Sequence, residues 1–170
     1  ELAATLAALE ADGCWPLLDA VLLGYFASAD AVAGAAATVA RIKADNARVR
    51  VLVDPILGDG GRLYIDEETA RAIQDRLLPL AGIATPNLFE LAWLTRESQS
   101  PDVAARAAAL GPGTVVVTSA RETDSEVTTL LVTPGNTTEF SSTRRHNIPN
   151  GSGDLLDGLF LGRLLQGESE

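Results

Sequence analysis

The chain has 170 residues, of which 46% are hydrophobic and 5% aromatic, and its formal net charge is −10. This length fits one domain of ordinary size, with a core built mainly from Ala, Leu, Val and Ile. The acidic balance and the lack of a long basic run argue against a nucleic-acid or anionic-membrane partner. No apolar stretch reaches the roughly 18 residues that a membrane-spanning helix requires.

The single cysteine, Cys14, excludes an intrachain disulfide and favours a reducing, cytoplasmic setting. The chain opens inside a helix-like pattern, "ELAATLAALEADG", and stops within "LLQGESE". We therefore expect residues 1–170 to form a single domain that is the central portion of a longer one.

The first half of the chain alternates short apolar strands with helices. Ser28 is a typical N-cap for a long Ala-rich helix, and the acidic residues that follow Asp66 suit the dipole at a helix start. In chain order we expect a strand at residues 20–23, a helix at 29–46, a strand at 49–53, a helix at 66–78, a strand at 82–85 and a helix at 87–95.

The second half adds a buried strand and a hairpin. Ser100 and Pro101 predict a helix start, with Ser as the cap and Pro at the first helical position. We then expect a strand at 114–118, a β-hairpin of 126–132 and 137–142, and a last helix at 152–165. Near-continuous apolar strands that alternate with helices indicate an α/β fold, with a mostly parallel sheet flanked by helices and the antiparallel hairpin at one edge.

Polar residues follow each predicted strand of the parallel sheet. In such sheets ligands bind outside the carboxyl ends of the strands, so these residues are expected on one rim. They are Gly24 and Tyr25, then Asp54 and Asp59, then Thr85, Asn87 and Glu90, and finally Thr118 and Ser119. The oxygen atoms of Asp59, Asn87 and Glu90 are ligands of the kind that Mg²⁺ prefers, often through water. Asn87 has the simpler alternative of being only an N-cap.

The stretch "GSGD", residues 151–154, stands at the start of the last helix. Glycines let the backbone approach a phosphate closely, and the exposed amides of a helix start favour an anion. Asp154 beside them can accept a proton from an attacking hydroxyl, as phosphoryl transfer requires. The alternative is that Asp154 merely caps the helix.

Three segments, "DPILGDGGRLY", "TPNLFE" and "NGSGDLLDGLFLGRLL", resemble the pyridoxal kinase family of the ribokinase-like superfamily. The resemblance extends from about residue 18 to residue 165 and implies one ribokinase-like kinase domain. The family transfers the γ-phosphate of ATP to the 5′-hydroxymethyl group of pyridoxal, pyridoxine or pyridoxamine in vitamin B6 salvage. The resemblance implies ATP, Mg²⁺ and a monovalent cation such as K⁺ as cofactors. It also implies a small-molecule vitamer as the substrate, and a homodimer.

The resemblance also implies a role for each matched residue. Asp154 would be the catalytic base, also in contact with the substrate, and Gly151, Ser152 and Gly153 would form the anion hole. Asp59, Asn87 and Glu90 would lie at the ATP phosphates, with Asp59 and Glu90 at Mg²⁺. A monovalent cation would be held by Asp54, Thr85 and Thr118. The nucleotide would be approached by Tyr64, Thr118 and Ser119. The vitamin pocket would be lined by Tyr25.

Two alternatives stay open at this point. A hydroxymethylpyrimidine or sugar kinase of the same superfamily shares the "DP" and "TPN" motifs, although the pyrimidine kinases commonly have a cysteine at the position of Asp154. A non-catalytic fragment that binds nucleotide or vitamin is the other alternative, because the family's terminal parts, which supply much of the vitamin pocket and cover the adenine, are not visible in this chain.

Overall fold

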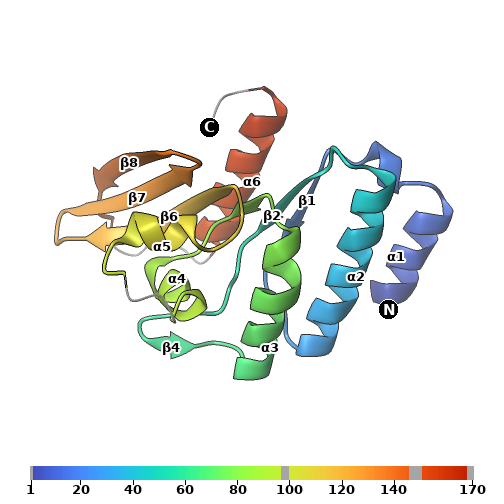
Figure 1. Cartoon of the computed structure of the whole chain (residues 1–170), viewed down its shortest axis with the longest axis horizontal. Helices are drawn as coiled ribbons and strands as arrows, with labels where there is room; N and C mark the ends of the chain where they lie inside the picture. Colours follow the sequence, from blue (N-terminus) through green and yellow to red (C-terminus); the bar gives the residue numbers. More distant parts are fainter. Residues whose placement is uncertain (1, 97–99, 146–150, 168–170) are drawn as a thin grey trace.

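A computed structural model of the chain describes residues 2–96, 100–145 and 151–167. Its centre is a six-stranded sheet with the strand order β1-β2-β5-β6-β7-β8 (Figure 1). The first four strands are parallel, and the last two run antiparallel at one edge. The strands are β1 (Ala20–Leu23), β2 (Arg50–Val53), β5 (Ile83–Ala84), β6 (Thr114–Glu122), β7 (Glu126–Thr133) and β8 (Asn136–Thr143). The predicted α/β architecture is therefore confirmed.

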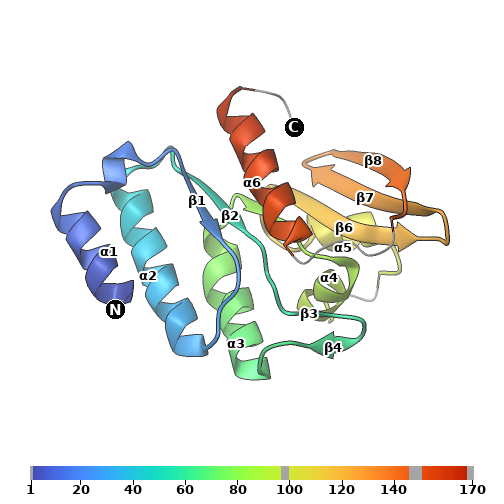
Figure 2. The same ribbon diagram turned by 180° about the vertical axis from the view of Figure 1, so that it is seen from behind.

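Helices cover the two faces of the sheet unequally. The helices α1 to α5 lie on one face, and α6 alone lies on the other, as the two opposite views show (Figures 1 and 2). Their bounds are α1 (Leu2–Ala11), α2 (Ala29–Asp45), α3 (Glu67–Ala72), α4 (Leu88–Leu94), α5 (Val103–Ala108) and α6 (Ser152–Leu165), and a short 3₁₀ turn (Trp15–Leu17) precedes β1.

The alternation of side chains along β2 creates the two layers. Val51 and Val53 point into the main core beneath α2 and α3, whereas Leu52 points to the opposite face. There Leu52 packs against Leu161 and Leu164 of α6. A separate cluster fills the space between α4, α5, β6 and β7. The strand ends of β2, β5 and β6 are thus held from both sides, which fixes the rim that carries the polar residues.

Several predicted boundaries differ from the structure. The helix expected at 66–78 begins as α3, capped by Asp66, but continues as a π-helical turn (Ile73–Leu77) and a 3₁₀ turn (Leu78–Leu80). The prediction that Ser100 caps the next helix was wrong: Asp102 is the N-cap, and its Oδ1 accepts the N–H of Ala104. Asp102 is the N-cap instead of Ser100 because it is two residues nearer to the helix, where its side chain reaches the N–H of Ala104 directly.

The sequence patterns also missed two strand features. β6 continues four residues beyond the predicted end, to Glu122, through a register shift between Val117 and Arg121. A small antiparallel pair, β3 (Gly58–Asp59) and β4 (Arg62–Leu63), lies within the "DPILGDGGRLY" segment. Strands of two residues have no periodic pattern in the sequence. The Gly60-Gly61 turn between them is therefore the only sequence feature that indicates the pair.

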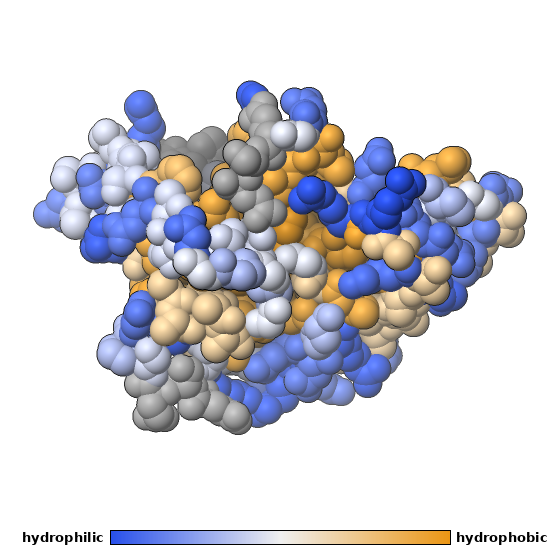
Figure 3. Space-filling model, turned by 45° about the horizontal axis from the view of Figure 1, so that its top comes forward, coloured by the Kyte–Doolittle hydropathy of each residue, from blue (hydrophilic) through white to orange (hydrophobic). Residues whose placement is uncertain are grey.

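The face that carries α6 leaves apolar surface open. Figure 3, in which the top of the view in Figure 1 comes forward, shows a broad hydrophobic area near the middle of the molecule. The exposed large apolar side chains of α6 and β1 are Leu155, Leu156, Leu159, Leu165 and Leu22. Among the described residues, no helix has both the length and the apolar character needed to cross a membrane.

Candidate active site

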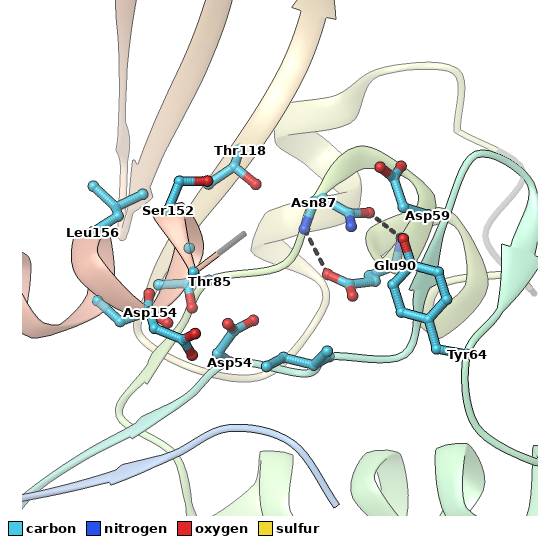
Figure 4. A pocket seen from close by; sticks show the side chains of 14 residues that line it. Asp54, Asp59, Tyr64, Thr85, Asn87, Glu90, Thr118, Ser152, Asp154 and Leu156 are labelled. Atoms are coloured by element: carbon cyan, nitrogen blue, oxygen red, sulfur yellow. Dashed lines mark hydrogen bonds between the residues drawn. The ribbon is translucent and has the colours of Figure 1, made fainter. Parts of the chain in front are cut away.

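A cavity of about 500 Å³ opens at the carboxyl ends of β2, β5 and β6, beside the start of α6. Most of the residues predicted for the site line it (Figure 4). They are Asp54, Asp59, Tyr64, Thr85, Asn87, Glu90, Thr118, Gly151, Ser152, Gly153 and Asp154. Residues from four separate stretches of sequence therefore meet in one place, as the rule for open parallel sheets predicts.

Three residues predicted for the rim, Gly24, Tyr25 and Ser119, are not part of this lining. Tyr25 follows β1 with 60% of its surface exposed, and it is not among the described residues around the cavity. Ser119 directly follows Thr118, but its backbone has a φ of 49°, in the left-handed region, where β6 shifts register. This local twist separates it from Thr118, which does line the cavity.

Asn87 and Glu90 form a capping box at the start of α4. Asn87 Oδ1 accepts the N–H of Glu90 at 2.8 Å, and Glu90 Oε2 accepts the N–H of Asn87 at 2.9 Å. The Asn87 side chain also donates from Nδ2 to the carbonyl oxygen of Gly58 at 2.9 Å. Capping is thus a confirmed role of Asn87, and it leaves the side chain at the cavity wall.

Glu90 also anchors the loop that follows β2. Its Oε1 accepts the N–H groups of Leu57 at 2.9 Å and of Gly58 at 3.3 Å. The side chain is buried, and this burial raises its pKa to about 7, against the opposing effect of the backbone N–H donors from Asn87, Leu57 and Gly58. Through hydrogen bonds to both of its carboxylate oxygens, Glu90 organises the rim.

Asp59 has more freedom to meet a ligand. It is exposed at the tip of the β3–β4 pair, and its Oδ1 accepts only the N–H of Gly60 at 2.7 Å among the hydrogen bonds of the described residues. Tyr64 lies beside it with 57% of its surface exposed, and the N–H of Tyr64 donates to the carbonyl oxygen of Leu57. Figure 4 shows Asp59 and Tyr64 at one end of the cavity and Asp154 at the other.

Thr85 and Thr118 close the floor between these ends. The N–H of Thr85 donates to the carbonyl oxygen of Val53, and the N–H of Thr118 donates to that of Pro86. A parallel bridge joins Asn87 to Thr118, so α4 and β6 hold each other at the rim. The Thr85 side chain is buried, and its hydroxyl has no hydrogen-bond partner.

The last helix begins as predicted. Gly151 has a φ of 90°, a conformation that glycine adopts without steric cost, and α6 runs from Ser152 to Leu165. The free N–H groups of its first turn and the exposed carboxylate of Asp154 therefore face the same cavity. The asparagine that precedes Gly151 in the quoted motif lies outside the described residues.

A buried pair of acidic residues lies beneath Asp154, and the sequence patterns missed one of its members. Asp54, at the end of β2, and Asp157, one turn into α6, are within hydrogen-bonding reach of each other. Burial is the main cause that raises the pKa of Asp54 to about 9, with the charge of Asp157 next. Burial raises the pKa of Asp157 as well, partly offset by the Thr85 hydroxyl and by Asp54.

Asp157 could have been found from helical spacing. It lies on the same stripe of α6 as Leu161 and Leu164, four and seven residues further on, and all three are buried. Leu155 and Leu159 are instead exposed. An acidic residue on the apolar stripe of a helix is the signal that marks a buried polar site.

The described residues contain no cluster of three or more His, Cys, Asp or Glu side chains arranged to hold a metal ion by themselves. Mg²⁺ that enters together with nucleotide phosphates does not need such a cluster, because it usually keeps several waters and one or two carboxylates. The exposed carboxylate of Asp59 fits that requirement.

Comparison with known proteins assigns the family. The model of the phosphomethylpyrimidine kinase family matches residues 18–169. The chain belongs to the phosphomethylpyrimidine kinase family.

Within this family the chain is similar to pyridoxal kinases. It is 37% identical to the pyridoxine/pyridoxal/pyridoxamine kinase of Bordetella avium, over 95% of this chain and 57% of that protein. It is 36% identical to the pyridoxal kinase of Granulibacter bethesdensis, over 95% of this chain and 61% of that one. The chain thus spans about three fifths of the length of these curated relatives.

Solved structures of pyridoxal kinases are also similar to this chain. The crystal structure of pyridoxal kinase from Entamoeba histolytica matches with a TM-score of 0.85 and 28% identity, over 96% of this chain and 61% of that one. Pyridoxal kinase from Leishmania donovani, in complex with ADP and pyridoxamine, matches with a TM-score of 0.81 and 28% identity, over 99% of this chain and 61% of that one. The ribokinase-like fold expected from the motifs is therefore confirmed.

Proposed function

We propose that this family member acts as an ATP-dependent pyridoxal kinase, which phosphorylates the 5′-hydroxymethyl group of pyridoxal, pyridoxine or pyridoxamine. The observation that carries the proposal is the position of Asp154. Its exposed carboxylate shares one cavity with the free N–H groups of the α6 start, while Asp59 and Tyr64 lie across that cavity. The similarity to curated pyridoxal kinases supports the choice of substrate.

The proposed reaction is an in-line displacement. The substrate hydroxyl attacks the γ-phosphorus of ATP, and Asp154 accepts the hydroxyl proton on a carboxylate oxygen. The bond between that phosphorus and the β–γ bridging oxygen breaks, and ADP leaves. The N–H groups of Gly151, Ser152 and Gly153 would stabilise the transferring phosphoryl oxygens.

Asp59 and Tyr64 are proposed to lie at the nucleotide, together with the wall formed by Asn87, Glu90 and Thr118. Asp59 would hold Mg²⁺, directly or through water, with Glu90 behind it. When bound, Mg²⁺ neutralises charge on the ATP phosphates. Tyr25 remains a proposed contact to the vitamin and Ser119 to the nucleotide. We also propose a homodimer and a cytoplasmic setting for the whole protein.

ATP consumption tests this proposal. We would measure it with Mg²⁺ and pyridoxal, with hydroxymethylpyrimidine and with ribose, and use Asp154→Ala as the blank. Because Asp154 is exposed, its removal should leave the fold intact and lower kcat about 10²–10⁴-fold, the usual contribution of a general base. Turnover with hydroxymethylpyrimidine alone would identify the pyrimidine kinase that the family description favours as the alternative. A folded full-length protein without turnover would identify a binding role.

A further inference from the structure

Gly24 directly follows β1, and neither its backbone conformation nor its packing requires a glycine there. Its φ does not lie in the left-handed region that favours glycine. A β-carbon built on it would lie 3.6 Å from Ile56 Cδ1 and 4.0 Å from Asp154 Oδ1, both ordinary contact distances. Gly58 is different, because a β-carbon there would overlap a backbone carbonyl oxygen. The fold should therefore accept alanine at position 24.

The missing side chain of Gly24 would enter the space between Ile56 and Asp154. Both of these residues line the cavity, although Gly24 itself does not. Apart from its neighbours in the chain, no other atom of the described residues lies within 4 Å of that β-carbon position. Gly24 thus borders an open gap with the half-buried Ile56 on one side and the carboxylate of Asp154 on the other.

The gap has the right place for the acceptor of the phosphoryl group. A hydroxyl that gives its proton to a base must come within about 2.6–3.2 Å of a base oxygen. The carbon that carries this hydroxyl lies one bond further away from the base. A β-carbon 4.0 Å from Asp154 Oδ1 stands in the same layer and would compete with that carbon for space. Water has no such carbon and would not meet this competition.

We propose that Gly24 determines which acceptors can reach Asp154. Its lack of a side chain leaves the room that the hydroxyl-bearing carbon of a bulky alcohol needs beside Ile56. This inference rests on the proposed function, because it takes Asp154 to meet the vitamer hydroxyl. A side chain at position 24 should exclude the vitamer and spare the nucleotide, since Asp59 and Tyr64 lie at the other end of the cavity (Figure 4).

The test measures binding separately from turnover. Calorimetric titration of the full chain with pyridoxine and with ADP gives the two Kd values. Pyridoxine is the probe because, unlike pyridoxal, it has no aldehyde that reacts with amines. The variant is Gly24→Ala, and Gly113→Ala is the matched control. Gly113 directly precedes β6 and does not line the cavity, and a β-carbon there would lie 3.9 Å from the carbonyl oxygen of Gly82.

Gly24→Ala should raise the Kd of pyridoxine about 10–100-fold, the range that one methylene commands in a close-fitting pocket. The Kd of ADP should stay within about twofold of the wild-type value, and kcat/KM for pyridoxine should fall by the same factor as its affinity. Hydrolysis of ATP with water as the acceptor should not fall. Gly113→Ala should leave both Kd values unchanged.

A second variant covers the case in which Gly24→Ala fails to fold. Ile56→Phe narrows the same gap from its other side and should weaken pyridoxine binding while ADP binding is kept. Equal pyridoxine Kd values for wild type and a folded Gly24→Ala would overturn the inference alone. An equal loss of pyridoxine and ADP binding would also overturn it, because that result indicates a general distortion.

The same titrations separate this inference from the proposed function. Wild-type protein that binds pyridoxine without turning it over would overturn the kinase function, and the comparison of Kd values would still decide the role of Gly24. Folded wild-type protein that does not bind pyridoxine at all would overturn both.

Discussion

The carboxyl groups of Asp54 and Asp157 face each other on the floor of the cavity, and each side chain is at least nine-tenths buried. They are far apart in the sequence, one directly after β2 and the other in α6. Two like charges at such a place oppose each other and are poorly solvated, so the ionised pair destabilises the folded protein unless a proton or a cation intervenes.

This pair should make the stability of the cation-free protein depend on pH. Asp54 has a pKa of about 9 when folded and an ordinary value near 3.8 when unfolded, so between these values only the folded state holds the proton. Stability therefore falls as pH rises through this window, by at most about 1.4 kcal/mol per pH unit for one proton. Urea unfolding in EDTA from pH 5 to 8.5 would measure the slope. Asp157→Asn should flatten it, and an unchanged slope would contradict the assignment.

Replacing Glu90 by Gln should destabilise the protein. The Gln side chain has one acceptor oxygen instead of two, and its amide would face backbone N–H groups that now donate to Glu90. We expect a loss of about 1–3 kcal/mol in the free energy of unfolding. Denaturant unfolding would measure it, with the exposed Glu68→Gln on α3 as the matched control. A loss no larger than that of the control would show that the loop is held by other contacts.

Gly58 should not tolerate a side chain. A β-carbon there would overlap the carbonyl oxygen of Arg62 and approach the Phe89 ring to 2.9 Å. Gly58→Ala should therefore cost about 1–3 kcal/mol of stability and displace the β3–β4 pair that carries Asp59. Gly158→Ala on α6 is the control, because nothing lies within 4 Å of the added carbon. That variant should gain up to about 1 kcal/mol from its higher helix propensity. Thermal unfolding of both variants tests the contrast.

Ser119 should become more stable as glycine. Its φ of 49° is the only positive value among the non-glycine residues that the structure describes. The left-handed conformation costs a residue with a β-carbon about 1 kcal/mol, which glycine avoids. Ser119→Gly should thus raise the free energy of unfolding by about 0.5–1 kcal/mol, whereas Ser125→Gly in the β6–β7 turn should lower it slightly. If both substitutions destabilise the protein equally, the local conformation of Ser119 is not strained.

Features with a local cause could be predicted from the sequence. The bounds of α6 follow from the glycine at 151 and the apolar pattern after it, and the Ser28 cap of α2 is confirmed by the N–H of Ala31 donating to its side chain. The meeting of Asp54, Thr85 and Asn87 followed from strand order alone, because parallel strands end on the same rim.

Features that depend on distant contacts could not be predicted. The turn at Ile73–Leu77 is π-helical, and both its end residues are buried in the core. Local helix propensity does not distinguish such a turn from an α-helix. The burial of Asp157 depends on how α6 lies against β2 and β5. The double role of Glu90 depends on a loop 32 to 33 residues earlier in the chain, whose amide groups donate hydrogen bonds to its side chain.

That last contact has a consequence for the motions of the protein. The amides of Leu57 and Gly58 are held by a side chain whose position requires the first turn of α4. Their exchange with solvent deuterium should therefore follow the opening of α4 and not the faster fluctuations usual for loops. The segment that presents Asp59 and the helix behind it then open and close as one cooperative unit.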